Sequence, residues 1–272
     1  MANPFKDKLE LEEEIVSFLK KHKSFISNQG NRISDFFEMC CYNYVVKYYQ
    51  SEGFEVQVQN LINNRFKYKL STKGYPKNFS FFKISKTINV NSQKQIVEFE
   101  IHHNLTVESE VDDEIYTTPD IVVINAGKIV EDVEHYSVVN SSLKYCYVKN
   151  EDLQTFCEVK QFNPFPELLF NFIGVLLELK STYAIENSEK HEPQHLAPTL
   201  LISGKGNLHT DKIKISLENR YYINIIYDVF EYKSKPLVNN KKNIKTIPSF
   251  NPQYKPLEVK LNKQIDIIDL PF

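Results

Sequence analysis

The stretch from residue 156 to residue 203 limits the folds open to this chain more than any other. It begins with a short apolar run, Phe156–Phe162, of the length and composition typical of a buried strand. A longer apolar run, 165–186, follows and is long enough for a helix, and Thr199–Ser203 is again strand-like. Two strands joined by a helix lie parallel in one sheet, with the helix packed across a face of that sheet.

The rest of the chain adds helices and strands on both sides of this unit. Apolar residues recur with helical spacing over 9–27 and 33–52, and strand-like patterns follow these two segments. The further expected strands are 54–59, 96–107, 119–125 and 221–232. The helix from Phe165 is apolar nearly all round, which predicts a buried crossover. The fold class predicted is α/β (α+β), with a mixed central sheet flanked by helices.

The same pass along the chain predicts three regions. Residues 1–30 form an N-terminal helix, 31–232 form the core, and 233–272 form a basic tail rich in Pro, Lys and Asn. Two polar or ambiguous spans, about 60–92 and about 127–152, are interpreted as insertions in the core. The tail carries eight lysines against three acidic residues, and we expect it to be extended and arm-like.

Composition excludes several classes of protein. With 42% hydrophobic and 25% charged residues, the chain is an ordinary globular protein, and no apolar run approaches the ~18 residues of a membrane span. The formal net charge of −2 gives no overall basic field for nucleic acid. The four cysteines have neither metal-finger spacing nor a disulfide pattern. We therefore expect a cytoplasmic protein with reduced thiols and no membrane partner.

Two short motifs carry the chemistry. Thr118-Pro119-Asp120 precedes a β-branched run, and Glu158 and Lys160 lie two residues apart in the expected central strand. Because side chains alternate along a strand, Glu158 and Lys160 point to the same face. Charged groups at the end of a buried strand are costly, and they are kept mainly where a metal or an anionic substrate needs them. The motifs therefore indicate metal-dependent chemistry on a phosphodiester.

These residues resemble the PD-(D/E)xK nuclease superfamily, which has a restriction-endonuclease-like core. The matching positions are Glu38 in the second helix, Asp120 after proline, and Glu158 and Lys160 on a later strand followed by a helix and a strand. The resemblance covers roughly residues 33–228. The step of 38 residues from Asp120 to Glu158 is long for the motif, which is why a hairpin is expected within 127–152.

The resemblance implies a Mg²⁺ site, in which Mn²⁺ can substitute. Asp120 and Glu158 would supply carboxylate ligands, with the carbonyl of Val159 as a further ligand. Lys160 would orient the attacking water or stabilise the phosphate, and Gln161 would hydrogen-bond the phosphate backbone. Family members often have a further acid on the early helix, a role that Glu38 would fill.

Simpler interpretations of the same residues remain open. Glu158 and Lys160 are also a normal surface ion pair, Asp120 a normal turn aspartate, and Glu38 a normal exposed helix residue. The leading hypothesis is a Mg²⁺-dependent DNA nuclease, in a restriction or phage-defence setting. The first alternative is an inactive nuclease-fold subunit that binds nucleic acid, a protein partner or a second copy of itself. The second alternative is a partner-binding protein that uses the tail as a docking arm.

Overall fold

The structure, a computed structural model, describes residues 13, 16–17, 33–72, 74–132, 145–184, 193–229, 236–239 and 241–256. Of the helix expected over 9–27, only Glu13, Val16 and Ser17 are described, and all three are helical. The remainder of that expectation lies outside the described residues.

The helices and strands follow one another along the chain in a mixed order. The α-helices are α2 (Ile33–Ser51), α3 (Pro166–Lys180), α4 (Leu208–Arg220) and α5 (Pro236–Asn239). The strands are β1 (Glu55–Gln59), β2 (Phe81–Val90), β3 (Gln93–His103), β4 (Thr106–Glu108), β5 (Tyr116–Thr117), β6 (Ile121–Asn125), β7 (Ile129–Asp132), β8 (Tyr145–Val148), β9 (Leu153–Lys160), β10 (Gln194–Leu196), β11 (Thr199–Ile202), β12 (Asn224–Ile226), β13 (Thr246–Pro248) and β14 (Tyr254–Pro256). Short 3₁₀ turns are η1 (Pro76–Asn78), η2 (Asn150–Asp152), η3 (Ser181–Ala184) and η4 (Lys241–Asn243).

The predicted mixed central sheet is present. Its strand order is β1-β2-β3-β6-β9-β11-β12, and β14 pairs with β3 in addition. Strands β1 to β9 in this sheet run antiparallel to their neighbours, whereas β9, β11 and β12 are parallel. The helix α3 connects β9 to the parallel β11, as the apolar run after the central strand predicts. A smaller sheet has the order β5-β4-β8-β7.

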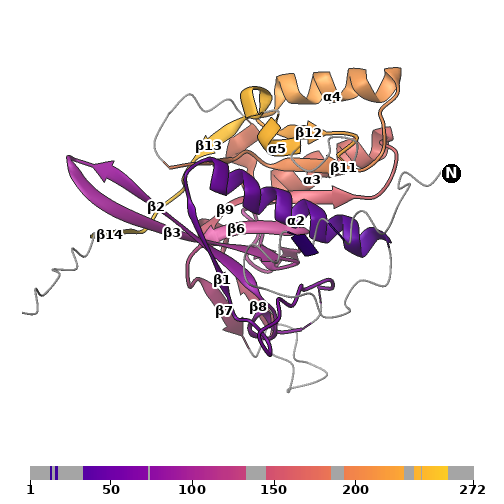
Figure 1. Cartoon of the computed structure of the whole chain (residues 1–272). Coiled ribbons are helices and arrows are strands. Elements are labelled where there is room, and N and C mark those ends of the chain that lie inside the picture. The colour runs from indigo at the N-terminus through magenta and orange to yellow at the C-terminus, as the bar shows by residue number, and fades with distance from the viewer. Residues whose placement is uncertain are drawn as a thin grey trace, which may run out of the picture.

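Two hydrophobic clusters hold helices on opposite faces of the central sheet. One cluster joins α2 to residues such as Cys157 and Val159 of β9. The other joins α3 to Val122 of β6 and Phe156 of β9, whose side chains alternate with those of the first cluster. Figure 1 shows α2 crossing in front of β6 and β9. The molecule thus has helix, sheet and helix layers around two cores.

The expectation of a polar insertion over 60–92 is wrong for its second half. Residues 81–90 form β2, a ten-residue strand of the central sheet, and in Figure 1 the β2–β3 hairpin projects from the body. Phe82, Ile84 and Ile88 are buried at strand spacing, while the alternate positions include Lys83, Ser85, Thr87 and Asn89. The polar residues on this face are the reason why the sequence pattern did not indicate a strand.

The expected strand 96–107 is divided at Asn104. The φ angle of this residue is +51°, in the left-handed region that asparagine tolerates better than most residues. The chain therefore leaves the central sheet after β3 and continues as β4 in the smaller sheet. The hairpin expected within 127–152 is present, since β7 and β8 pair antiparallel.

Two further expectations need correction. The strand predicted over 221–232 is only three residues long in the described part of the chain, because β12 ends at Ile226 and Asp228 adopts a left-handed φ of +54°. The helix α3 is not buried all round, because Phe170 and Leu177 are exposed on its outer face. Apolar residues on that face do not imply burial.

The tail is not a free arm over its described residues. Strand β13 pairs with β10, strand β14 pairs with β3, and Ile247 and Leu237 are fully buried. The side chain of Gln154 in β9 binds both backbone groups of Phe250. Its Nε2 donates to the Phe250 carbonyl at 2.6 Å, and its Oε1 accepts from the Phe250 N–H at 2.7 Å. Short edge strands and a few apolar anchors therefore bind this segment to the core. Residues 257–272 lie outside the described residues.

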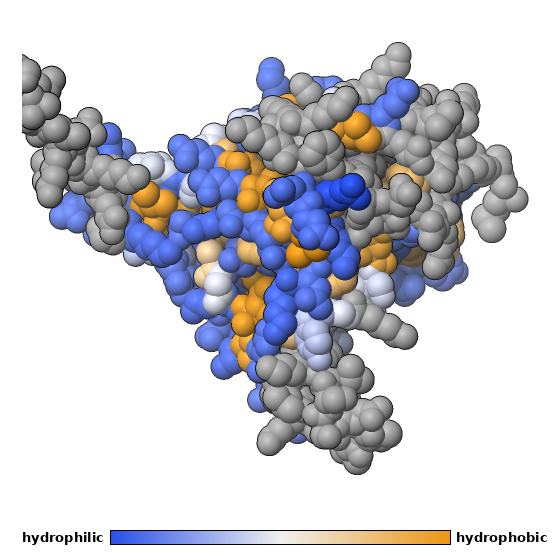
Figure 2. All heavy atoms as spheres, turned by 60° about the horizontal axis from the view of Figure 1, so that its bottom comes forward, coloured by the Kyte–Doolittle hydropathy of each residue, from blue (hydrophilic) through white to orange (hydrophobic). Residues whose placement is uncertain are grey.

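No helix in the described part of the chain is long and apolar enough to cross a membrane. The side of the molecule turned forward in Figure 2 is mainly hydrophilic, with smaller hydrophobic areas between the polar ones.

Candidate active site

Strand pairing brings together three charged residues of the two motifs. Strands β6 and β9 are antiparallel, with Ile121 opposite Cys157. Asp120, one residue before β6, is therefore placed opposite Glu158. Lys160 follows Glu158 on the same face of β9 because side chains alternate along a strand. Two segments separated in sequence thus deliver their charged groups to one end of the sheet.

The face of the sheet on which these groups lie follows from the register with β11. Leu200 pairs with Glu158 and Ile202 pairs with Lys160, and both apolar side chains pack in the α3 cluster. Neighbouring residues in register point to the same face. The Glu158 and Lys160 side chains therefore lie on the α3 side of the sheet, and α2 covers the other side.

The lysine ammonium lies between the two carboxylates. Lys160 Nζ is 3.0 Å from Asp120 Oδ2 and 2.6 Å from Glu158 Oε2. The backbone N–H of Val159 also donates to Asp120 Oδ2, at 2.6 Å. The two carboxylate side chains are mostly buried, while the Lys160 side chain is 31% exposed. The group is therefore compact and reachable from solvent through its lysine.

Burial and mutual repulsion change the protonation of this group. Burial of the Glu158 carboxyl and the nearby Asp120 raise its pKa, Lys160 lowers it, and the net result is a pKa of about 7. Burial of Lys160 acts to lower its pKa, but Asp120 and Glu158 outweigh this and hold that pKa above its ordinary value.

The donor set fits a Mg²⁺ ion. Asp120 and Glu158 present carboxylate oxygens from adjacent strands, and Mg²⁺ is commonly held by one or two carboxylates with waters and substrate phosphate. Among the described residues, no group of three or more His, Cys, Asp and Glu side chains could hold an ion. A third protein ligand would therefore be a backbone oxygen, such as the carbonyl of Val159. The Lys160 ammonium lies between the two carboxylates and would have to move aside for an ion that bridges them.

Glu38 lies apart from this group. It extends from α2, which packs on the opposite face, and its Oε2 is 3.6 Å from Nε2 of His103. The side chain of Glu38 is partly exposed, whereas His103 is buried, with no hydrogen-bond partner for either ring nitrogen among the described residues. Among the described residues, no hydrogen bond or ion pair joins Glu38 to Asp120, Glu158 or Lys160. Glu38 and Asp120 both lie near enough to Cys41 to add to the effect of burial, which raises the pKa of that thiol.

The positions of Val159 and Gln161 agree with their expected roles. These positions alone do not test the roles. Val159 is fixed by its N–H bond to Asp120, and its side chain is buried in the α2 cluster. Gln161 is half-buried directly after β9. The use of the Val159 carbonyl as a ligand and of Gln161 as a phosphate donor remain predictions.

Asn104 is a supporting residue that the sequence analysis missed. Its backbone N–H donates to the carbonyl of Asp120 at 2.9 Å. Lys69 in turn binds the carbonyl of Asn104, and burial lowers the pKa of Lys69 to about 8. The sole sequence signal was an asparagine inside an expected strand, because the burial of Lys69 depends on residues distant in the chain.

Histidine, cysteine and tyrosine side chains elsewhere in the fold have structural roles. His102 faces Glu100, with Nε2 at 2.8 Å from Oε2, on the face opposite to that of His103. Cys40, Cys41 and Cys157 are buried and form no disulfide among the described residues. The tyrosines of α2 at positions 42, 44, 48 and 49 are core residues.

The loop Ser203–Asn207 is a turn that leads into α4. Asn207 caps α4 by accepting from the N–H groups of His209 and Thr210. Gly204 is needed because a Cβ there would lie 2.2 Å from Asn163 Oδ1 and 2.6 Å from the carbonyl oxygen of Phe162. The loop after β11 is therefore packed tightly on the segment that follows Lys160.

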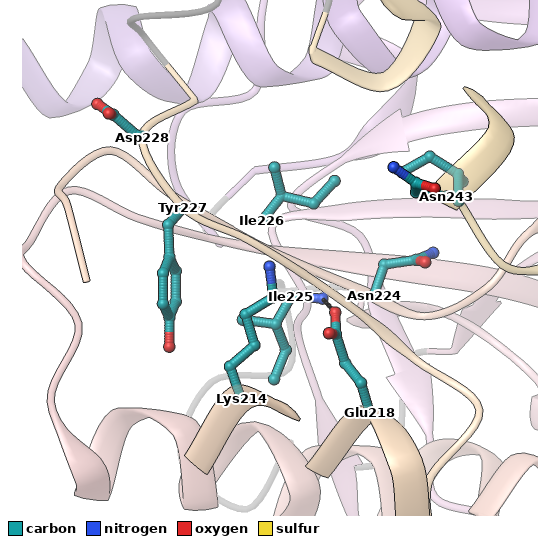
Figure 3. A pocket seen from close by; sticks show the side chains of 9 residues that line it. Lys214, Glu218, Asn224, Ile225, Ile226, Tyr227, Asp228 and Asn243 are labelled. Carbon is teal, nitrogen blue, oxygen red and sulfur yellow. Dashed lines mark hydrogen bonds between the residues drawn. The ribbon is translucent and has the colours of Figure 1, made fainter. Parts of the chain in front are cut away.

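A cavity of about 330 Å³ lies elsewhere, between the outer edge of β12 and α4. Figure 3 shows Glu218 of α4 pointing to Ile225, whose N–H donates to Glu218 Oε1 at 2.8 Å. Lys214 lies beside the ring of Tyr227. None of Asp120, Glu158 and Lys160 lines this cavity. It is separate from the candidate active site.

Comparison with known proteins does not identify a relative. A scan against family models, a search of curated proteins and a search of solved structures each returned no match.

Proposed function

We propose that this protein is a metal-dependent nuclease that hydrolyses phosphodiester bonds of DNA, with Mg²⁺ as its cofactor and Mn²⁺ as a substitute. The observation that carries the proposal is the convergence of Asp120 and Glu158 on Lys160 Nζ, at 3.0 and 2.6 Å. The two motifs lie far apart in sequence, yet their charged groups meet at one end of the sheet. A turn aspartate and an unrelated surface ion pair would have no reason to meet in this way.

The order of elements supports the resemblance to the PD-(D/E)xK superfamily. Helix α2 precedes the antiparallel β3-β6-β9 unit, and α3 then crosses to the parallel β11. In the resemblance, a helix comes first, Pro-Asp opens one strand, Glu-x-Lys lies on the next central strand, and a helix and a strand follow. The α/β arrangement therefore agrees with a restriction-endonuclease-like core.

In this proposal, each residue of the group has a chemical task. Asp120 and Glu158 would hold the ion, which would supply an acidified water and neutralise charge on the phosphate. Lys160, moved from between the carboxylates, donates to the attacking water or to a phosphate oxygen. Gln161, directly after Lys160, hydrogen-bonds the phosphate backbone. Glu38 is retained as an auxiliary acid on the side of the sheet covered by α2.

The biological setting is part of the proposal and rests on the resemblance alone. We place the nuclease in the cytoplasm, in restriction or phage defence. A protein partner or a second copy of the chain would supply part of the DNA-binding surface, because the net charge of −2 provides little general attraction to phosphate.

A cleavage assay tests the proposal. Purified protein with Mg²⁺ or Mn²⁺ is expected to nick or degrade plasmid DNA, while Asp120→Ala and Lys160→Ala abolish cleavage. Asp113→Asn, which changes an exposed aspartate in the turn before β5, is the matched control and retains activity. Cleavage that survives Asp120→Ala in a pure preparation would show that the nuclease centre is elsewhere.

An inactive subunit is the second candidate function. The observation that favours it is the Lys160 ammonium between the carboxylates, which neutralises them without a metal. In that case the wild-type protein binds nucleic acid or a protein partner and cleaves neither plasmid nor oligonucleotides with either ion.

A further inference from the structure

The segment that follows Lys160 holds two phenyl rings out into solvent. Phe162 is 50% exposed and Phe165 is 43% exposed, while Pro164 between them is buried. Two exposed phenyl rings within four residues are unusual at the end of a buried strand, because burial of a phenylalanine side chain is favourable. Phe162 is two residues from Lys160, a chain distance of at most about 7 Å.

The backbone of this segment is fixed, so the exposure of the rings does not come from a loose loop. The carbonyl of Phe162 accepts from the N–H of Gly204 at 3.0 Å. The carbonyl of Phe165 accepts from the N–H of Leu169 at 3.3 Å, in the first turn of α3. The close approach of Gly204 to Asn163 closes the remaining space. The fold therefore holds both rings at the surface beside the candidate active site.

Cationic groups lie on the two chain segments that meet here. Lys160 is 31% exposed and Lys205, in the adjoining loop, is 66% exposed and 3.3 Å from Asp228. Amines next to exposed aromatic rings are the combination by which proteins hold single strands, with cations on the phosphates and rings on the bases. The faces of paired bases are covered by their neighbours in a duplex, so this combination selects unpaired bases.

We infer that Phe162 and Phe165 form a stacking platform for unpaired bases, which makes single-stranded or locally opened nucleic acid the substrate class of this protein. The inference rests on the proposed function for its link to cleavage. The binding itself requires no metal and can be measured without catalysis.

Fluorescence anisotropy with a labelled oligothymidylate in EDTA tests the platform. The Phe162→Leu/Phe165→Leu protein keeps apolar side chains without aromatic faces, and its Kd for the single strand is expected to rise about tenfold or more. The Phe162→Tyr/Phe165→Tyr protein keeps the aromatic faces and is expected to stay within about twofold of wild type. Phe170→Ala is the control, because Phe170 is 51% exposed and lies within α3, outside the segment 162–165.

The outcomes separate this inference from the proposed function. Equal single-strand affinity of the Leu variant and wild type overturns the platform, as does tighter binding of wild type to a duplex of the same length. A Leu variant that loses self-association while it keeps single-strand affinity shows that the rings serve a second copy of the chain, and it also overturns the platform. Asp120→Asn is expected to lose cleavage while it binds the single strand in EDTA. Cleavage that survives this change overturns the nuclease proposal alone.

Discussion

Lys69 and Asn104 are bonded to each other in both directions. The Lys69 ammonium donates to the Asn104 carbonyl, and the Asn104 side-chain amide donates to the Lys69 carbonyl at 2.8 Å. Lys69 Nζ also donates to the carbonyls of Ser71 and Thr72, at 2.9 and 3.0 Å. Because the Asn104 N–H binds the Asp120 carbonyl, this pair joins the loop after β1 to the residue that begins the candidate active site.

We expect Lys69→Met to destabilise the protein by about 2–4 kcal/mol, because it leaves buried carbonyls without donors. Urea unfolding measures the change. Lys67→Met is the matched control, since Lys67 lies two residues away and places its ammonium over the Phe79 ring at 4.9 Å. Equal stability of the two variants would contradict a supporting role for Lys69.

The raised pKa of Glu158 predicts a pH dependence of folding. The ordinary carboxyl pKa is about 4.3, whereas that of folded Glu158 is about 7, so the folded state retains a proton that the unfolded chain releases between these values. Stability contributed by this group is therefore present at low pH and lost as the pH rises through 7. Glu158→Gln should remove this loss, so that its stability exceeds that of wild type by about 2–3 kcal/mol at pH 8 and much less at pH 5. Parallel pH profiles of the two proteins would show that Glu158 does not titrate in this way.

Removal of the lysine should expose the metal preference of the two carboxylates. Without metal, Lys160→Met leaves Asp120 and Glu158 to repel each other and is expected to lower stability by about 2 kcal/mol. Mg²⁺ or Mn²⁺ should then raise the thermal midpoint more in Lys160→Met than in wild type, because the ion no longer competes with an ammonium. Ca²⁺ should also bind, while supporting little cleavage in wild type.

Asp120→Ala serves as the reference for those ion measurements. It removes one of the two carboxylates, and we expect it to respond to Mg²⁺ far less than wild type. Equal thermal shifts in Asp120→Ala and wild type would place the ion elsewhere on the protein.

The stability of the protein should depend on the buried side chains of the α3 cluster and little on exposed apolar side chains. Ile173→Ala is expected to cost about 2–5 kcal/mol through lost burial and the cavity that remains. Ile215→Ala, on a residue of α4 that is 59% exposed, makes the same chemical change and is expected to cost less than about 1 kcal/mol. Similar losses in the two variants would contradict the assignment of α3 to the core.

Local sequence patterns were sufficient to predict the parallel part of the central sheet and the common face of Glu158 and Lys160. The strand–helix–strand run predicts the parallel β9 and β11, and the alternation along β9 places Glu158 and Lys160 on one face. Strand β2 was missed because its exposed positions are strongly polar, although Phe82 and Ile84 alternate as in any half-buried strand.

Contacts between distant segments account for what the sequence did not predict. Nothing near Lys69 indicates that three carbonyls, one of them 35 residues away, surround its ammonium. The orientation of Glu38 toward His103 depends on how α2 lies over the sheet, which no helical period determines. The docking of β13 and β14 depends on partners that precede them by about 50 and 150 residues.

The docked segment has a consequence for how the protein is made. Phe250 occupies both polar groups of the Gln154 side chain, and Ser249 Oγ lies 2.7 Å from Nε2 of the buried His195. A chain translated only as far as residue 245 therefore lacks the donor to Gln154 Oε1 and one of the two acceptors of its amide, which also donates to Asn125 Oδ1 at 3.1 Å. Synthesis must pass residue 250 before strand β9, which also bears Glu158 and Lys160, is fully supported. The order of translation thus delays the last contacts of β9 until nearly all of the described chain has been made.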